Sequence, residues 1–258
     1  MAQCTPKSFD LTGKVALITG ASYGIGMAIA KAMAANGATI VFNDIKQELV
    51  DKGIAAYTEA GIKAHGYVCD VTDEDAVNAM VAKITEEVGH INILVNNAGI
   101  IKRCDAIDVT PENWDAVDFL NEKMVFFLSQ AVAKQWVADK KGGKIINIAS
   151  MLSFQGGIRV PAYTSSKSAV MGMTKALANE WAKYGINVNS IAPGYMAPNH
   201  PNQLRQDEDR SEEILARIPA GRWGTPADVG GAAIFLASDA AAYVNGYTLA
   251  VDGGWLAR

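Results

Sequence analysis

The 258-residue sequence is poor in the residue types that bind metals and form cross-links, with 3 cysteines and 3 histidines. Cys4, Cys69 and Cys104 lie far apart, form no Cys-x-x-Cys pair and are accompanied by no cluster of histidines. This pattern excludes a cysteine-based metal site and a disulfide framework. We expect reduced thiols, a cytoplasmic protein and no bound metal.

Long hydrophobic runs and a strong charge of one sign are also absent. The apolar stretches are far shorter than the roughly 20 residues that span a bilayer, and the N-terminus lacks the pattern of a signal peptide. The formal net charge of −4 argues against nucleic acid or a membrane surface as the partner. An anionic substrate would therefore have to be held by a few local cations.

The sequence does contain enough apolar residues, 50% of the total, to build a large core. Short, continuously apolar β segments alternate with helical patterns from residues 14–19 to residues 247–251. Such strands are typical of a parallel sheet with helices on both faces. No linker interrupts the alternation, so we predict one doubly wound α/β domain over residues 1–258, with a lid-like loop around residues 195–215.

A glycine-rich turn follows the first predicted strand. Gly20, Gly24 and Gly26 stand between strand and helix, where a dinucleotide-binding fold has its first turn. Glycine permits a positive φ and leaves no Cβ in the way of a pyrophosphate, and the helix N-terminus attracts anions. A tight turn that needs only small residues is the alternative. We predict a dinucleotide site that also includes Ser22, Tyr23 and Ile25.

Asp44 ends the second predicted strand, 18 residues after Gly26. A carboxylate there can accept hydrogen bonds from both hydroxyls of an adenine ribose, and it would repel a 2′-phosphate. Lys46 is the only nearby cation that could attract such a phosphate. We predict NAD in preference to NADP. A helix N-cap is the alternative role of Asp44, and the two roles are compatible.

Tyr163 and Lys167 stand at i, i+4 on a later predicted helix, so their side chains share one face. A phenol with a pKa of about 10 is a poor base at neutral pH, but a nearby ammonium and an oxidised nicotinamide favour the phenolate. Alone, such a pair is more often part of a solvated face. Here Ser150, thirteen residues upstream, and residues 96–99 each end a predicted strand, where parallel sheets bind ligands.

The glycine turn, Asn96-Asn-Ala-Gly99, Ser150, Tyr163-x-x-x-Lys167 and Pro193-Gly194 occur in a characteristic order, and along essentially its whole length the chain resembles the short-chain dehydrogenase/reductase family. The resemblance implies a Rossmann-type sheet of about seven strands and a homotetramer. It implies Tyr163 as general acid/base and Ser150 as the hydrogen-bond partner of the reacting oxygen. Lys167 would hold the nicotinamide ribose and lower the tyrosine pKa.

The same resemblance implies that Asn121, in a long helix beginning at Thr110, supports a water that relays protons. Relatives commonly carry an apolar and a small residue next, whereas this chain has Glu122-Lys123-Met124. A charged, bulky pair there can shift the helix or change subunit packing. The resemblance also implies further cofactor contacts. Asp70 and Val71 would contact the adenine, and Asn97, Ala98 and Gly99 the adenosine ribose. Pro193, Gly194 and Met196 would contact the nicotinamide amide.

Residues 146–161, 189–196, 218–224 and 251–258 resemble the keto-deoxygluconate dehydrogenases of this family, and residues 20–26 and 39–44 its gluconate dehydrogenases. The resemblance implies a sugar acid as substrate. Reduction of unsaturated-uronate breakdown products or of another polyol or ketone is an alternative. A non-catalytic NAD sensor is a remoter one, because sensing would not require the serine, tyrosine and lysine.

Arginine side chains are the candidates for binding a sugar-acid carboxylate. Arg103, Arg159 and Arg205 are close in sequence to the predicted site, and a guanidinium can hold a carboxylate with two hydrogen bonds. A surface ion pair is the alternative for each. Trp223 and Trp255 are expected to be packing or subunit-contact residues rather than platforms for the substrate.

Overall fold

The computed structural model describes residues 5–197 and 208–258. Its centre is a sheet of seven strands in the order β3-β2-β1-β4-β5-β6-β7, with every neighbouring pair parallel. The strands are β1 (Val15–Thr19), β2 (Thr39–Asp44), β3 (Ala64–Val68), β4 (Ile91–Asn96), β5 (Gly143–Ile148), β6 (Ile186–Pro193) and β7 (Thr248–Val251). The strand order reverses between β1 and β4, which is where such sheets bind ligands. The predicted α/β domain with a doubly wound, Rossmann-type sheet is confirmed.

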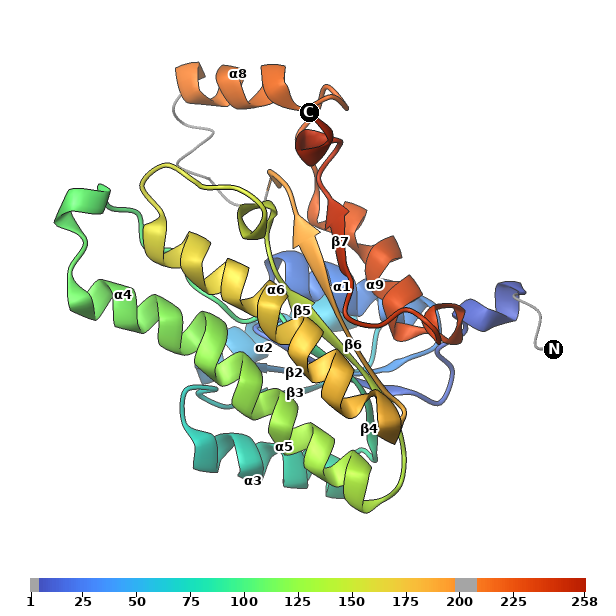
Figure 1. Cartoon of the computed structure of the whole chain (residues 1–258). Helices are drawn as coiled ribbons and strands as arrows, with labels where there is room; N and C mark the ends of the chain where they lie inside the picture. The colour runs from blue at the N-terminus through green and yellow to red at the C-terminus, as the bar shows by residue number, and fades with distance from the viewer. Residues whose placement is uncertain (1–4, 198–207) are drawn as a thin grey trace.

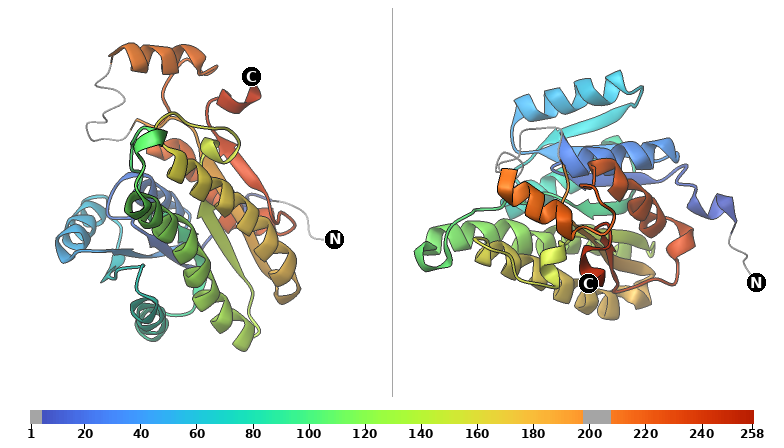
Figure 2. Two further views of the ribbon diagram at one scale, coloured as in Figure 1. Left: turned by 60° about the vertical axis from the view of Figure 1, so that its left-hand side comes forward. Right: turned by 90° about the horizontal axis from the view of Figure 1, so that it is seen from above.

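Helices cover both faces of the sheet (Figure 1; Figure 2 gives two further views). One layer contains α1 (Gly24–Ala35), α2 (Gln47–Glu59) and α9 (Gly230–Ala237), and the other contains α3 (Glu74–Glu87), α4 (Pro111–Asp118), α5 (Met124–Ala138) and α6 (Pro161–Trp181). Successive side chains of a strand point to opposite faces. Ile18 therefore packs with Ile29 of α1, whereas Leu17 belongs to the core with Leu128 of α5. Burial on both faces explains the continuously apolar strands.

Helix α8 (Glu208–Arg217) lies beyond the carboxyl ends of the strands and close to the C-terminus (Figure 1). A separate hydrophobic cluster joins Ile214 and Ile218 to Trp255 and to Met151, which follows β5. Arg258 donates hydrogen bonds to the last two carbonyl groups of α8. The last residues of the chain thus hold α8 beside the end of the sheet where ligands are expected.

The helix predicted to begin at Thr110 is not continuous. A π-helical turn (Phe119–Lys123) separates α4 from α5, with Asn121 buried inside it. Periodicity does not distinguish such a turn from regular helix, and π turns are frequent at functional sites. Shorter 3₁₀ segments are Pro6–Phe9, Ala106–Asp108, Met151–Ser153, Ala182–Tyr184, Pro226–Val229, Asp239–Ala241 and Trp255–Ala257. Among the described residues, no helix is both long and apolar enough to cross a membrane.

Candidate active site

The glycine turn after β1 has the backbone that the sequence predicts. Gly20 and Gly24 have φ values of 60° and 64°, in the left-handed region that favours glycine. A Cβ on Gly26 would lie 2.5 Å from Nδ2 of Asn97, so no side chain fits there. Asn97 in turn donates hydrogen bonds to the carbonyl oxygens of Thr19 and Gly20, at 2.8 and 3.0 Å. The turns after β1 and β4 therefore form one unit.

This unit has the features that a dinucleotide phosphate requires. The hydroxyl of Ser22 is buried, and among the described residues it has no hydrogen-bond partner. A buried hydroxyl without a partner is costly unless a ligand supplies one. A Cβ on Gly24 would meet no atom within 4 Å, so there is open space beside the turn. Ile25 lies in the first turn of α1, next to Gly24, and the Tyr23 side chain is exposed. The residues present fit a nicotinamide dinucleotide.

Two carboxylates stand at strand ends on the predicted adenine side, Asp44 as the last residue of β2 and Asp70 two residues after β3. Asp44 is buried, and its Oδ1 accepts a hydrogen bond of 2.9 Å from the backbone of Ile45. The N-cap of α2 is Lys46, so the alternative role of Asp44 as a helix cap is wrong. Asp70 accepts two hydrogen bonds from Thr72, at 2.9 and 2.7 Å, which close the turn after β3. Val71 is buried beside it.

The structure brings Ser150, Tyr163 and Lys167 together at the carboxyl end of β5. The Lys167 side chain is buried, and its Nζ lies 5.6 Å from the centre of the Tyr163 ring. It donates a 2.7 Å hydrogen bond to the carbonyl oxygen of Ile148, which fixes its direction. Ser150 lies close enough to Tyr163 to lower the pKa of its phenol, and the Ser150 hydroxyl accepts from the backbone N–H of Leu152 at 3.1 Å. The half-buried phenol thus stands between a hydroxyl and an ammonium.

Burial dominates the protonation of both titratable groups. It raises the pKa of Tyr163, although the hydrogen bond with Ser150 and the positive charge of Arg103 act in the opposite direction. It lowers the pKa of Lys167 from 10.5 to about 8, because a buried ammonium loses its hydration. In the protein alone, the tyrosine is therefore protonated at neutral pH, and forming the phenolate requires further positive charge. A bound oxidised nicotinamide would supply it.

Asn121 lies close to this group. Its Oδ1 accepts a hydrogen bond from the backbone N–H of Ile100, and its Nδ2 donates to the carbonyl of the same residue. Nδ2 also lies 3.3 Å from the hydroxyl of Ser166, on α6 between Tyr163 and Lys167. The π turn thus brings Asn121 up to the helix that carries the tyrosine and the lysine. Met124 is buried, whereas the Lys123 ammonium lies over the Phe119 ring at 4.8 Å.

A cavity of about 450 Å³ opens in front of Ser150 and Tyr163. Gly194 and Met196 line it at the end of β6, and Gly194 approaches β7 so closely that a Cβ would lie 2.7 Å from Asp252. Pro193, the last residue of β6, pairs with Val251. The predicted nicotinamide side and the hydroxyl-bearing residues therefore face one space.

The predicted substrate arginines have different surroundings. Arg103 lines the cavity, and among the described residues it has neither an ion pair nor a hydrogen-bond partner for its side chain. Arg159 also lines it, but its guanidinium forms a 2.9 Å ion pair with Asp105. Arg205 lies outside the described residues, as do residues 198–207 of the predicted loop around 195–215, and from Glu208 on the predicted loop is helix α8 instead. Within the described part, Arg103 is thus the better placed of the three to receive a carboxylate.

Several residues of the cavity wall were not predicted from the sequence. Ile101, Ile158, Tyr195 and Arg210 line it, and so does Trp223, which was expected to be a packing residue. Large apolar side chains in the segments that follow β4, β5 and β6 were the available signal. Among the residues described by the structure, no group of three or more His, Cys, Asp or Glu side chains could hold a metal ion.

Comparisons with known proteins agree with this geometry. The sequence profile of the family described as enoyl-(acyl carrier protein) reductase matches residues 20–256. The chain is 58% identical to 2-dehydro-3-deoxy-D-gluconate 5-dehydrogenase from Dickeya dadantii, over 97% of this chain and 98% of the relative. It is 42% identical to gluconate 5-dehydrogenase from Gluconobacter oxydans, over 96% and 97% of the two chains. The protein belongs to the short-chain dehydrogenase/reductase family, as its motifs predicted, and is an oxidoreductase.

Solved structures show the same similarity. A gluconate 5-dehydrogenase from Burkholderia cenocepacia, in complex with NADP and tartrate, superposes with a TM-score of 0.93 at 40% identity, and the match covers 98% of each chain. A 2-keto-3-deoxy-D-gluconate dehydrogenase from Streptococcus agalactiae is 51% identical over 96% of each chain, with a TM-score of 0.83.

Proposed function

We propose that this protein is a sugar-acid dehydrogenase that moves a hydride between NAD(H) and a secondary alcohol or ketone of a keto-deoxygluconate or ketogluconate. The observation that carries the proposal is one cavity lined by Ser150, Tyr163 and an arginine without a partner among the described residues, with the buried Lys167 ammonium 5.6 Å from the centre of the tyrosine ring. The carbonyl of a keto-acid would bind at Ser150 and Tyr163, and its carboxylate at the guanidinium of Arg103.

The chain's own residues then have separate roles. NAD, when bound, accepts or supplies the hydride. Ser150 donates a hydrogen bond to the reacting oxygen, while Tyr163 takes its proton during oxidation and returns it during reduction. Lys167 uses one N–H on the Ile148 carbonyl, which leaves other donors for the nicotinamide ribose. Asn121 supports a water through which the tyrosine exchanges its proton with solvent.

The remaining predicted contacts form the cofactor site. The phosphates are held by the turn after β1, with the buried Ser22 hydroxyl as a donor. Asp44 accepts hydrogen bonds from the adenine ribose, and its negative charge favours NAD over NADP. The related Burkholderia enzyme was solved with NADP, so this preference requires its own measurement.

The substrate is proposed to be the keto-deoxygluconate type ahead of the ketogluconate type. Relatives named 2-dehydro-3-deoxy-D-gluconate 5-dehydrogenase are 46 to 58% identical, whereas those named for gluconate or 5-keto-D-gluconate are 37 to 44% identical. A reductase of unsaturated-uronate breakdown products is the second candidate, because the same cavity would hold another keto-acid with its carboxylate at Arg103.

The location of the enzyme, its oligomeric state and a lid over its cavity belong to the same proposal. We propose a cytoplasmic homotetramer, with residues 195–215 as a lid over the cavity. The support for the lid is that Tyr195 and Met196 at its start, and Arg210 in α8, line the cavity. Arg205 as a further substrate contact remains a prediction.

A steady-state screen tests the proposal. Purified protein is assayed with NAD, NADP and their reduced forms against deoxy-ketogluconates, ketogluconates, gluconate and neutral polyols of equal length. We expect turnover of the acids and little of the polyols, with NAD(H) preferred. Equal rates on acids and polyols would contradict the proposed binding of the substrate carboxylate by Arg103. A preference for NADP(H) would contradict the proposed binding of the adenine ribose by Asp44. An Asp44→Ala variant separates the two cofactors further, because it should gain activity with NADP(H).

A further inference from the structure

The segment after α8 places one aromatic ring at the substrate cavity. Trp223 lines the cavity that contains Ser150 and Tyr163, and its side chain is half-buried. We propose that Trp223 determines specificity, by providing an apolar wall for the carbon chain of the sugar acid, and that the Arg222–Asp228 ion pair positions it. The proposal rests on the proposed function and names the part of the site that selects among sugar acids.

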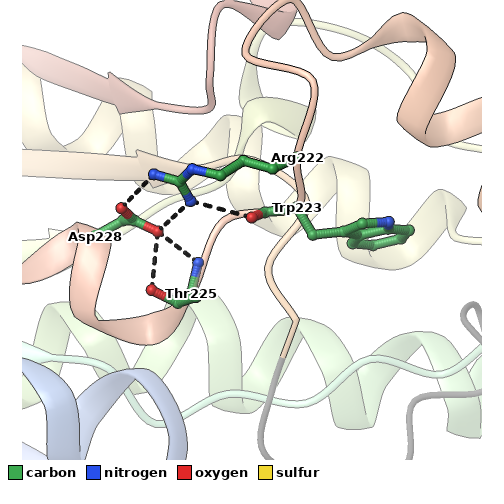
Figure 3. A network of polar contacts seen from close by, with 4 residues as sticks. All are labelled: Arg222, Trp223, Thr225 and Asp228. Carbon is green, nitrogen blue, oxygen red and sulfur yellow. Dashed lines mark hydrogen bonds and ion pairs between the residues drawn. The ribbon is translucent and has the colours of Figure 1, made fainter.

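A closed ring of polar contacts fixes the backbone of Trp223 (Figure 3). The guanidinium of Arg222 donates two hydrogen bonds of 2.8 Å to the two oxygens of Asp228, and a third of 3.1 Å to the carbonyl oxygen of Trp223. Asp228 also accepts from the backbone and the hydroxyl of Thr225, at 2.6 and 2.9 Å. In Figure 3 the Arg222 side chain points toward Asp228, whereas the indole points to the opposite side.

A second set of contacts joins this segment to the end of β6. The N–H of Gly224 donates to the carbonyl of Tyr195 at 2.9 Å, and the N–H of Ala197 donates to the carbonyl of Gly224 at 2.7 Å. A Cβ on Gly224 would lie 2.5 Å from the sulfur of Met196, so the two segments touch. Trp223 is therefore fixed relative to Met196, which is proposed to contact the nicotinamide.

Trp223 and Trp255 have different surroundings although both contact Tyr195. The Tyr195 ring lies 5.5 Å from Trp223 and 4.8 Å from Trp255, both nearly edge to face. Trp255 is buried, donates its indole N–H to Gln155 at 3.1 Å and lies under the guanidinium of Arg217. Among the described residues the Trp223 indole N–H has no such partner. Trp255 thus has the packing role that was expected of both, whereas Trp223 remains available to a ligand.

The chemistry of the substrate makes such a wall selective. A methylene carbon can lie against an indole ring without losing a hydrogen bond. A hydroxyl in the same place would lose its water without gaining a partner, which is unfavourable. A wall of this kind therefore favours a deoxy sugar acid over its fully hydroxylated counterpart.

Kinetics of matched variants test the proposal. KM and kcat are measured for a deoxy-ketogluconate and for 5-ketogluconate with wild type, Trp223→Phe and Trp223→Ala. We expect Trp223→Ala to raise KM for the deoxy acid about tenfold, with a smaller effect on kcat and on the hydroxylated acid. Trp223→Phe should keep the wild-type ratio of kcat/KM values within about threefold, because a ring remains. An unchanged ratio in Trp223→Ala, or an equal loss for both acids, would overturn the proposal.

The ion pair is tested as a positioning device in the same assay. Asp228→Asn should change the ratio of kcat/KM values in the same direction as Trp223→Ala, and Asp228→Glu should restore part of it because it keeps a carboxylate. If Asp228→Asn lowers kcat equally for both acids with an unchanged ratio, the positioning role is wrong.

A fluorescence titration covers the case in which Trp223→Ala does not fold. In a Tyr163→Phe background, which binds without turnover, the deoxy acid should quench tryptophan emission. Adding Trp223→Phe should abolish most of this quenching, whereas Trp114→Phe, on exposed helix α4, should not. Retained quenching in the Trp223 variant would overturn the proposal. Failure of wild type on every sugar acid would instead overturn the proposed function.

Discussion

The carboxamide of Asn121 binds both backbone groups of a single residue, Ile100, with Oδ1 accepting at 2.8 Å and Nδ2 donating at 2.9 Å. Ile100 directly follows the Asn-Ala-Gly turn after β4, and Asn121 is completely buried in the π turn between α4 and α5. The irregular helix and the loop at the cofactor side are therefore connected by two short hydrogen bonds.

Replacing Asn121 by Ala should destabilise the protein, because it leaves the N–H and C=O of Ile100 without their partners in a partly buried place. Each fully buried group of this kind costs about 1–3 kcal/mol, and because these two are only partly buried we expect a combined loss of about 2–4 kcal/mol. Urea unfolding followed by circular dichroism measures it. Asn113→Ala on α4, which removes only an exposed hydrogen bond from Lys102, is the control and should change stability by less than about 1 kcal/mol. Equal effects of the two substitutions would contradict the importance of the Ile100 contacts.

The burial of Lys167 predicts a pH-dependent stability. Its pKa falls from 10.5 to about 8 on folding, so the unfolded chain binds the proton more tightly. Stability should therefore rise with pH between about 8 and 10.5, where the folded protein has already released this proton. Over that range wild type should gain up to about 3 kcal/mol relative to Lys167→Met, which does not titrate. Unfolding midpoints in urea at three pH values give the comparison, and parallel curves for both proteins would contradict it.

Glu122, which departs from the usual family pattern, predicts the opposite trend at lower pH. Burial raises its pKa to about 7, with help from the hydrogen bond and the charge of Asp118. The folded protein then binds this proton more tightly than the unfolded chain, so stability falls as pH rises from about 4.5 to about 7. Glu122→Gln should remove this fall. Its gain in stability over wild type should therefore be larger at pH 8 than at pH 5.

The expected size for Glu122→Gln is on the order of 1 kcal/mol, because solvent screens a partly exposed carboxyl. Thermal unfolding at the two pH values measures it. Asp118→Asn should act in the same direction, since it removes the charge that acts on Glu122. A pH trend that survives in both variants would show that other groups cause it.

Local patterns in the sequence were enough to predict the sheet, the glycine turn and the meeting of Ser150, Tyr163 and Lys167. Each depends on strand ends or on a spacing within one helix. The π turn could not be predicted, because it depends on the contact of Asn121 with Ile100, which is remote in the sequence. The same holds for the cavity wall, because the position of Trp223 depends on the pairing of Gly224 with Tyr195 and Ala197 after β6, which is also remote in the sequence.

Arg159 has a φ of 64°, a left-handed conformation that residues with a side chain rarely adopt. Arg159→Gly should therefore be more stable than Arg159→Ala by about 1 kcal/mol, because only glycine adopts it without strain. Both variants lose the exposed ion pair with Asp105, so its contribution cancels in the comparison. Chemical denaturation of the two variants side by side measures the difference. If the alanine variant were the more stable one, the left-handed backbone would not be a source of strain.

Arg103 differs from Arg159 in having no partner among the described residues, and it predicts two separable effects. A guanidinium that binds the substrate carboxylate contributes roughly 1.5–3 kcal/mol, so Arg103→Ala should raise KM for a sugar acid about 10- to 100-fold. Its charge also lowers the pKa of Tyr163, which must be protonated to reduce a ketone, so the same variant should shift the basic limb of the pH–kcat/KM profile for reduction to higher pH. Arg103→Lys keeps the charge but loses the two-pronged hydrogen bonding, and it should raise KM while leaving the profile in place. Steady-state kinetics from pH 6 to 10 separate the effects. A KM for Arg103→Ala no higher than that of Arg159→Ala would show that the carboxylate binds elsewhere.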